Sequence, residues 1–410
     1  MTADRTGAAG PGIVDGRYTI VSADCHAGGS SDDYAVYLDP AYRDAYAEWR
    51  QAYANPFRDL QDGAKIRNWD DGVRNRELET EGIAAEVVFP NTVPPFFPTG
   101  QLIARPPRNG DDHRRRLAGI RAHNRWLVDW CDRLPGRRVG LAQVFLNDVE
   151  EAVADARWAA EAGLAGVLVP AVPPDSDVAP LFSAGHDRFW AACADLDLVV
   201  VQHGGGGMPA YRDTEAAYFL LLMEARFFAN RTLWHLVLSG VFERHPTLRF
   251  VMTEQGVSWL PSVLDEMDGY WQQMRRTGRV GELDFDVEAL LPRPPREYVA
   301  EQVWIGASFP APSDAAVIAE LGADRVMWGS DYPHDEGTQP DTTAALRRSF
   351  HDWEPADLAT ILAGTAAAVY GVDLPALAPV ASTIGPRVTE VAEPLDAIPP
   401  DNNSPAFSRP

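Results

Sequence analysis

The sequence predicts an α/β protein that folds as a (β/α)8 barrel. Eight short β-rich runs alternate with helical patterns through about residue 370. Most of these runs are continuously apolar, as expected for strands that are covered on both faces. Alternating strands and helices favour parallel pairing through βαβ crossovers, and eight such units suit a closed barrel. The runs cover residues 18–23, 85–89, 138–144, 166–169, 198–202, 248–253, 302–306 and 325–329.

Helical periodicity fills most of the intervals between these runs. The predicted helices cover residues 112–133, 149–162, 186–196, 214–243 and 256–276. Each is followed by a glycine, a proline or a polar break, which are the usual stop signals. Pro355 opens a last helix that runs to about Tyr370, because proline is well tolerated in a first helical turn.

The barrel is expected to span residues 18–372, with additions at both ends and one insertion. Residues 1–17 form a flexible N-terminus, and residues 28–78, rich in Tyr and Trp, form an insertion after the first strand. An insertion at that position lies over the barrel mouth, so we expect it to be lid-like. Residues 373–410 are rich in Pro, Ala, Ser and Asp, which predicts an extended C-terminal tail, disordered or clasping a neighbouring subunit.

Composition excludes several classes of protein. The 36 basic and 59 acidic residues give a formal charge of −23, and the basic residues are scattered, so neither nucleic acid nor an anionic membrane is an expected partner. Cys25, Cys131 and Cys193 are too few and too scattered for a disulfide framework or a zinc ribbon. Residues 1–12 lack a leader-like pattern and no apolar stretch is long enough for a membrane span, so we expect a cytoplasmic protein.

One predicted helical segment is unusually apolar. Residues 218–241 include Phe219, Leu220, Phe227, Phe228 and Trp234, and their apolar surface is too broad for one solvent-facing helix. Either the segment packs in an oligomer interface or it is buried in the core. We expect a homo-oligomer.

Acidic residues and histidines stand at the ends of several predicted strands. Asp24 and His26 follow the first run, and alternate residues of a strand share a face, so both side chains can point the same way. His203 ends the fifth run and precedes four glycines. Each feature also has an ordinary explanation, a solvated strand-end turn for Asp24 and a turn hydrogen bond for His203.

Carboxylates end two further runs. Glu254 follows the sixth run and Asp331 follows the eighth, with His334 three residues later. A buried carboxylate is costly unless it is paired or metal-bound. An arginine from the insertion could pair with Glu254, and Asp331 could cap a turn. In a barrel, however, the carboxyl ends of the strands meet at one mouth, which favours a metal-dependent enzyme.

Four motifs in this order resemble the amidohydrolase superfamily. They are Asp24-x-His26, the strand followed by His203-Gly, the run at residues 239–251, and Trp-Gly-Ser-Asp331-Tyr-Pro-His334. The branch that they resemble is the amidohydrolase-related one, with aminocarboxymuconate-semialdehyde decarboxylase and resorcylate decarboxylases. The resemblance spans residues 18–372. It implies a distorted TIM barrel whose metal is held by Asp24, His26, His203 and Asp331, with Asp331 also handling a proton.

Two positions depart from the pattern of that family. Asp24 and Glu254 stand where histidines are often found, so with Asp331 the site would carry three carboxylates. One divalent ion does not neutralise three negative charges, so either a carboxyl pKa rises or a second cation binds. We therefore expect one or two divalent ions, iron, zinc or manganese, with Glu254 as a further ligand and a candidate bridge.

The expected reaction is hydrolysis, with decarboxylation as the alternative. For hydrolysis, metal-activated water is the nucleophile, Asp331 is the general base and then acid, and His203 or His334 holds the oxyanion. A stiff aromatic loop at residues 90–98 favours an ester, a thioester such as an acyl-CoA, or an amide of a bulky hydrophobic or aromatic acid. Five aromatic residues near other strand ends point the same way: Trp259, Trp304, Trp328, Phe309 and Tyr332. A decarboxylase of an aromatic or unsaturated acid would use the same ligands, and a non-catalytic binding barrel is a second alternative.

Overall fold

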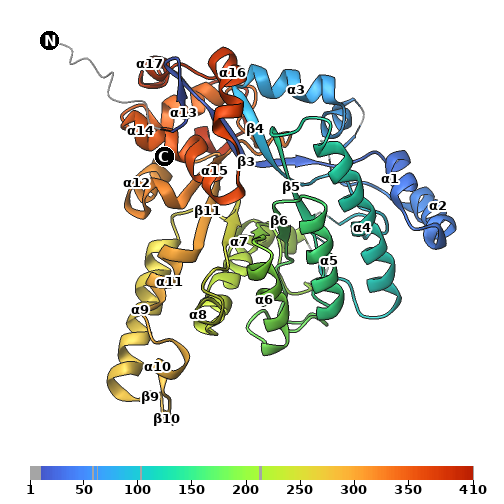
Figure 1. Ribbon diagram of the computed structural model, residues 1–410, viewed down its shortest axis with the longest axis vertical. Helices are drawn as coiled ribbons and strands as arrows, with labels where there is room; N and C mark the ends of the chain where they lie inside the picture. Colours follow the sequence, from blue (N-terminus) through green and yellow to red (C-terminus); the bar gives the residue numbers. More distant parts are fainter. Residues whose placement is uncertain (1–10, 58–59, 62, 102–103, 212–214, 410) are drawn as a thin grey trace.

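The computed structural model describes residues 11–57, 60–61, 63–101, 104–211 and 215–409. Its centre is an eight-stranded parallel sheet (Figure 1), and each predicted run overlaps one of its strands. In hydrogen-bonding order the strands are β12 (Val326–Gly329), β11 (Val303–Ser308), β8 (Phe250–Thr253), β7 (Val199–His203), β6 (Gly166–Leu168), β5 (Arg138–Gln143), β4 (Ile83–Pro90) and β3 (Ile20–Ala27).

The first and last strands of this sheet meet, which closes it into a distorted barrel. Cys25 on β3 forms a single parallel bridge with Tyr332, just beyond β12. His26 N donates to Tyr332 O at 2.6 Å, and Asp331 N donates to Asp24 O at 2.9 Å. The predicted (β/α)8 fold is therefore confirmed. The closure also brings the Asp24 and Asp331 segments side by side.

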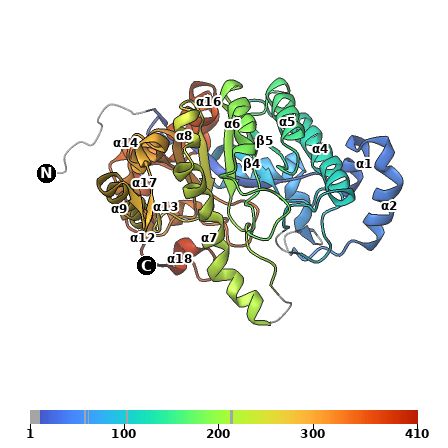
Figure 2. The same cartoon turned by 90° about the horizontal axis from the view of Figure 1, so that it is seen from below.

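Helices follow the strands and form the outer layer of the barrel (Figures 1 and 2). The helices that periodicity predicts are α4 (Asp111–Cys131), α5 (Val149–Glu161), α6 (Asp187–Asp195), α7 (Glu215–Leu238), α9 (Leu260–Thr277) and the continuous segment α14 (Pro355–Ala359), η6 (Thr360–Gly364) and α15 (Thr365–Tyr370). Thr214, where the fourth of these was predicted to begin, lies outside the described residues. The remaining barrel helices are α8 (Val241–Arg244), α10 (Val287–Leu290), α11 (Pro295–Gln302), α12 (Pro312–Leu321) and α13 (Thr342–Phe350).

Local signals in the sequence set the ends of several helices. The Asp148 side chain accepts from the backbone N of Glu150 at 2.9 Å and so caps the first turn of α5. Pro355 stands in the first turn of α14, as predicted. Gly278 ends α9 with φ at +66°, a left-handed conformation that glycine adopts without strain.

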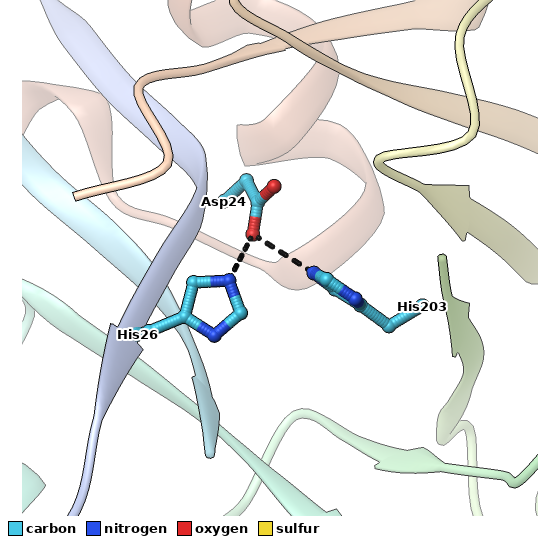
Figure 3. Close-up of side chains that lie close together, drawn as sticks. All are labelled: Asp24, His26 and His203. Atoms are coloured by element: carbon cyan, nitrogen blue, oxygen red, sulfur yellow. Dashed lines mark hydrogen bonds and ion pairs between the residues drawn. The ribbon is translucent and has the colours of Figure 1, made fainter. Parts of the chain in front are cut away.

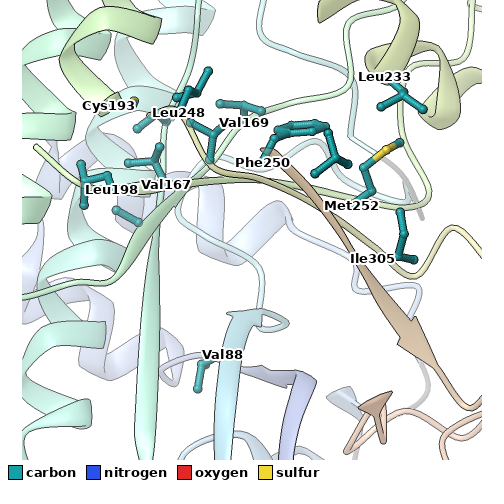
Figure 4. Close-up of a cluster of buried hydrophobic side chains, with 14 of the residues drawn as sticks. Val88, Val167, Val169, Cys193, Leu198, Leu233, Leu248, Phe250, Met252 and Ile305 are labelled. Atoms are coloured by element: carbon teal, nitrogen blue, oxygen red, sulfur yellow. The ribbon is translucent and has the colours of Figure 1, made fainter. Parts of the chain in front are cut away.

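Apolar side chains on both faces of the strands hold the barrel together. Along β7, Val199 and Val201 join one buried cluster and Val200 joins another, because alternate residues point to opposite faces. Figure 4 shows part of the second cluster, with Val88 and Phe250 among the labelled side chains. A framework packed in this way holds the strand ends in fixed positions.

The described residues of the 28–78 insertion pack along one side of the barrel and return to its mouth. They hold α1 (Ser31–Tyr37), η1 (Pro40–Tyr42), α2 (Arg43–Ala52), η3 (Ala64–Asn68) and most of α3 (Asp71–Thr80). The α1 helix lies beside α4, where Tyr34 Oη is 2.8 Å from His123 Nδ1. Beyond them, Arg67 Nη2 in η3 donates to Pro333 O at 3.0 Å. A lid-like role for this insertion stays a prediction.

The C-terminal segment is not the extended tail that its composition predicts. It forms α16 (Leu374–Ile384), α17 (Val388–Val391) and α18 (Pro405–Ser408), which pack on the barrel of the same chain. Tyr18 N donates to Pro386 O at 3.0 Å, and Leu377 and Phe407 are buried. Two prolines of this segment, Pro375 and Pro405, stand in the first turns of α16 and α18, where proline is well tolerated.

Residues 11–18 begin the described part of the chain and contain two short strands. A short antiparallel hairpin pairs β1 (Ile13–Val14) with β2 (Arg17–Tyr18), so residues 11–17 are not the flexible segment that was predicted. Residues 1–10, which the same prediction covers, lie outside the described residues. A second hairpin joins β9 (Arg279–Val280) to β10 (Leu283–Asp284) beyond α9.

The long apolar helix α7 is buried in one half and exposed in the other. Leu233, Leu236 and Val237 are fully buried in the core, whereas Phe219 and Met223 are 74% and 73% exposed. Figure 2 shows this helix extending away from the barrel. The oligomer interface therefore stays a prediction for the exposed half alone. In the described part of the chain, no helix is long and apolar enough to cross a membrane.

Candidate metal centre

Three predicted ligands meet at the mouth of the barrel, as Figure 3 shows. Asp24 and His26 lie on β3, and His203 ends β7. Oδ1 of Asp24 lies 3.3 Å from Nε2 of His26 and 3.4 Å from Nε2 of His203. Asp24 is fully buried and His26 is nearly so. The alternation predicted for the first strand thus directs both of its ligands to one point.

Backbone carbonyls fix the orientation of both imidazole rings. Nδ1 of His26 lies 3.2 Å from Pro90 O, and Nδ1 of His203 lies 3.2 Å from Gly204 O. A carbonyl only accepts, so each Nδ1 is the donor, and each Nε2 is the atom left to bind a metal. Nε2 of His26 is buried between two carboxylate oxygens, Oδ1 of Asp24 at 3.3 Å and Oδ1 of Asp331 at 3.2 Å. An imidazole nitrogen between two carboxylate oxygens is a donor set suited to a divalent cation.

Two further carboxylates, Glu254 and Asp331, lie at the mouth just beyond the ends of β8 and β12. Oδ1 of Asp331 lies 3.2 Å from Nε2 of His26 and 2.8 Å from Nδ1 of His334. Oε2 of Glu254 lies 3.5 Å from Nε2 of His203. Glu254 and Asp331 have φ values of +55° and +61°, a conformation that is rare outside glycine and is concentrated at functional sites.

The donor atoms form three overlapping groups whose members lie within 4.8 Å of one another. The groups are Asp24, His26 and His203; His26, Asp331 and His334; and Glu254, Asp331 and Glu336. Imidazole nitrogens mixed with carboxylate oxygens suit manganese, iron and zinc. All five predicted ligands meet at the mouth, which confirms the prediction of a divalent-metal site. Their individual roles, and the choice between one ion and two, stay predictions.

Close charges and burial shift the pKa values of these groups in opposite directions. Burial raises the pKa of Asp24, but the charges and hydrogen bonds of His203 and His26 outweigh it and hold the pKa well below its usual range. Burial lowers the pKa of His203, but Asp24 outweighs it and raises the pKa to about 9. Burial and the charge of Asp331 raise the pKa of Glu254 to about 7. A metal ligand must be deprotonated, so cation binding here releases protons.

Three neighbouring residues were missed by the sequence analysis. Ser308 Oγ donates a short hydrogen bond to Oδ2 of Asp24, and Asn91 Oδ1 lies 3.3 Å from Nε2 of His334. Glu336 joins one of the donor groups. Ser308 ends β11, so its place after the seventh predicted strand was an available signal. Asn91 and Glu336 lie in loops whose course the sequence pattern does not indicate.

A cavity of about 330 Å3 adjoins His203 at the ends of β5, β6 and β7. Phe97 and Phe145 give it an aromatic wall, and Arg116 and Gln143 bring polar side chains to it. Its size and mixed lining are typical of a site for a small molecule. The aromatic loop predicted after the second strand contributes to this wall.

The five other aromatic residues expected at the mouth do not line this cavity. Trp328 is buried in the core, Trp304 Nε1 donates to Asp324 O, and Tyr332 Oη donates to Glu77 Oε2 at 2.7 Å. Trp259 and Phe309 are likewise absent from its described lining. Position near a strand end is not enough, because the side chain can point away from the mouth.

Comparison with known proteins gives one family and a consistent set of relatives. The sequence model of the amidohydrolase family matches residues 24–372. The gamma-resorcylate decarboxylase of Rhodococcus jostii is 27% identical over 238 residues, which cover 55% of this chain and 69% of the relative.

Solved structures share the fold. The 5-carboxyvanillate decarboxylase of Novosphingobium aromaticivorans, solved with manganese and 4-hydroxy-3-methoxy-5-nitrobenzoic acid, aligns with a TM-score of 0.65 at 18% identity, over 87% of this chain and 97% of the other. The dihydroxybenzoic acid decarboxylase of a Polaromonas species, solved with manganese and 2-nitroresorcinol, aligns with a TM-score of 0.58 at 18% identity, over 86% and 97%. At such identities the likeness supports the barrel fold alone.

These comparisons correct the expected reaction. The prediction of a hydrolase for an ester, a thioester or an amide is wrong, because the sequence relatives are gamma-resorcylate decarboxylases. Solved neighbours include decarboxylases of 5-carboxyvanillate and 2,6-dihydroxybenzoate. Decarboxylation was the alternative that the sequence left open. The ligand residues did not separate the two reactions because both use the same metal centre.

Proposed function

The chain belongs to the amidohydrolase family, and we propose that it is a metal-dependent decarboxylase of a small aromatic acid. The names of its relatives support this reaction, since gamma-resorcylate is an aromatic acid. Within the protein, the observation that carries the proposal is that Nε2 of His203 faces Asp24 while the same side chain lines an aromatic-walled cavity. A ring in that cavity would lie beside the donor cluster.

The residues that would hold the ion are Asp24, His26, His203 and Asp331, with Glu254 as a further ligand. Manganese is our first choice because two neighbours of the same fold were solved with it, and the donor set suits it. When bound, the ion supplies positive charge that holds the substrate carboxylate or an adjacent phenol oxygen and stabilises negative charge there. The remaining chemistry falls to the side chains.

Decarboxylation needs a proton donor at the ring carbon that loses its carboxylate. The bond between that carbon and the carboxylate breaks, carbon dioxide leaves, and the carbon gains one proton. We assign the proton transfer to Asp331, which is fully buried and whose Oδ2 has no hydrogen-bond partner in the described part of the chain. His334 Nδ1, 2.8 Å from Oδ1 of the same carboxylate, holds it in place and can return a proton to it.

Release of carbon dioxide from hydroxybenzoic acids tests this function. Protein loaded with Mn²⁺ should decarboxylate at least one acid of such a panel, a chelator should stop the reaction, and added Mn²⁺ should restore it. Asp331→Asn should lower kcat by roughly 10²-fold or more. Asp335→Asn, an exposed change in the same loop, is the control. Fully loaded protein that leaves every acid of the panel intact would contradict the proposal.

A further inference from the structure

One cation that lines the cavity has no close anionic partner among the described residues. Arg116 on α4 is only 7% exposed, yet it lines the cavity beside His203. Within the described residues, its one carboxylate neighbour within 4 Å is Asp112, at 3.9 Å between Nη1 and Oδ2. That oxygen already accepts from Arg108 N at 2.8 Å. Consistent with a weakly compensated charge, burial lowers the pKa of Arg116.

Other buried arginines in the described structure are paired closely. Arg74 donates through Nε to Glu86 at 3.0 Å and 3.1 Å, and Arg138 Nη2 lies 2.7 Å from Asp71. A buried guanidinium without such a partner is unfavourable, because its donors lose water and gain little in return. The contrast indicates that no described residue supplies a close partner for Arg116, and its place in the cavity wall suits a partner on a bound ligand.

A second donor lines the same cavity without a partner. Nε2 of Gln143, at the end of β5, is buried and makes no hydrogen bond to any described residue. Phe145 packs on the guanidinium, with Cζ of Arg116 5.5 Å from the ring centre, so the arginine is supported from one side. A planar carboxylate matches the forked donors of a guanidinium better than any neutral group.

We infer that Arg116, aided by Gln143, binds a second carboxylate of the substrate. This inference rests on the proposed function and names its substrate class, an aromatic dicarboxylic acid. One carboxylate would lie at the donor cluster by His203 and leave as carbon dioxide, while the ring carbon takes a proton. The other would lie at Arg116 and remain on the product. The apolar wall of the cavity, including Phe97, accommodates the ring between them.

Binding of two simple acids to the Mn²⁺-loaded protein tests the inference without requiring turnover. Isophthalate carries two carboxylates and benzoate carries one, and their dissociation constants can be measured by titration calorimetry. The wild type should bind isophthalate about tenfold more tightly or better, as expected for a charged hydrogen-bonded pair. Arg116→Gln should weaken isophthalate binding far more than benzoate binding and so remove this preference, and Arg116→Lys should keep part of it.

The control is Arg121→Gln on the same helix. Arg121 Nε donates to Asp155 at 2.7 Å, and this side chain is not part of the described cavity lining, so the preference for isophthalate should survive. Equal weakening of both acids in Arg116→Gln, or a wild type without the preference, would overturn the inference. Carbon dioxide release from monocarboxylic acids alone would overturn it but leave the proposed function standing. If the preference for isophthalate depends on Arg116 but no acid is turned over, the inference would stand and the proposed function would be contradicted.

Discussion

Oδ1 of Asp24 lies 3.4 Å from Nε2 of His203, although 179 residues separate them in the chain. Their strands, β3 and β7, are not neighbours in the sheet, so the contact exists only because the sheet closes. The other oxygen of Asp24 accepts a hydrogen bond from Ser308. Oδ2 of Asp24 is therefore held by Ser308, while Oδ1 points at both histidines.

Loss of the Ser308 hydroxyl should weaken the metal centre. Ser308→Ala frees Oδ2 of Asp24, so the carboxylate loses its fixed orientation. Partners of metal ligands typically contribute roughly 10–100-fold to metal affinity. We expect a loss of that size in Mn²⁺ affinity, measured by competition with a chelating dye. Ser262→Ala removes an exposed hydroxyl on α9 and should have no effect; unchanged affinity in Ser308→Ala would mean that this bond does not orient Asp24.

The number of Mn²⁺ equivalents per protein chain shows whether the site binds one ion or two. If Glu254 bridges two ions, protein saturated with Mn²⁺ should hold two equivalents by elemental analysis, and Glu254→Gln should hold one. The change keeps the shape of the side chain but removes its charge. The site then has two carboxylates instead of three, which is too little negative charge to hold a second divalent cation. A single equivalent in the wild type, with full activity in Glu254→Gln, would rule out the second ion.

Gly329 permits the close approach of β12 to the metal ligands. A Cβ atom at this position would lie 2.6 Å from Cβ of Asp24, so Gly329→Ala must displace one strand. We expect a loss of about 1–3 kcal/mol in the free energy of unfolding, together with weaker Mn²⁺ binding. Gly269→Ala within α9 has open space around its Cβ and should be neutral or stabilising. Full metal affinity in Gly329→Ala would show that the strands can separate without moving Asp24.

A buried histidine should make the stability of the protein depend on pH. Burial lowers the pKa of His123 to about 3, so the folded protein keeps the ring neutral while the unfolded chain binds a proton below about pH 6.5. The contribution of the neutral His123 ring to the free energy of unfolding is thus present at neutral pH and is lost as the pH falls from about 6.5 toward 3. Between pH 7 and pH 5 this loss amounts to about 2 kcal/mol.

Urea unfolding of His123→Gln at the two pH values tests this contribution. The variant is expected to be less stable at pH 7, because the Tyr34 contact at 2.8 Å is weakened, but to lose less stability on acidification. Ser262→Ala, an exposed change that involves no titratable group, should keep the pH dependence of the wild type. An unchanged pH dependence in His123→Gln would assign it to other groups.

Much of the barrel and its ligand set follows from local patterns in the sequence. Apolar runs locate the strands, and the predicted run at residues 166–169 differs from β6 (Gly166–Leu168) by a single residue. The carboxyl ends of the strands converge in any closed parallel barrel. The positions of Asp24, His203 and Asp331 after predicted strands were therefore enough to predict that they lie close together.

Other features depend on tertiary contacts that no local pattern contains. Arg116 looks like an ordinary polar residue of a helix, and only the packing of α4 beside β5 brings it to the cavity. The positive φ values of Glu254 and Asp331 stand just beyond strand ends, at residue types that do not indicate this conformation. The C-terminal helices were missed because composition alone does not distinguish a proline that starts a helix from one that prevents it.

The identity of the product formed in D₂O tests the central claim most directly. A metal-dependent decarboxylase should release one carbon dioxide per substrate, and the ring carbon that lost its carboxylate should carry one deuterium, visible by NMR. The Mn²⁺-loaded protein should give this product, and Asp331→Asn should give little of it. A product that keeps every carboxylate, or aromatic acids that remain unchanged with the metal site full, would contradict the account.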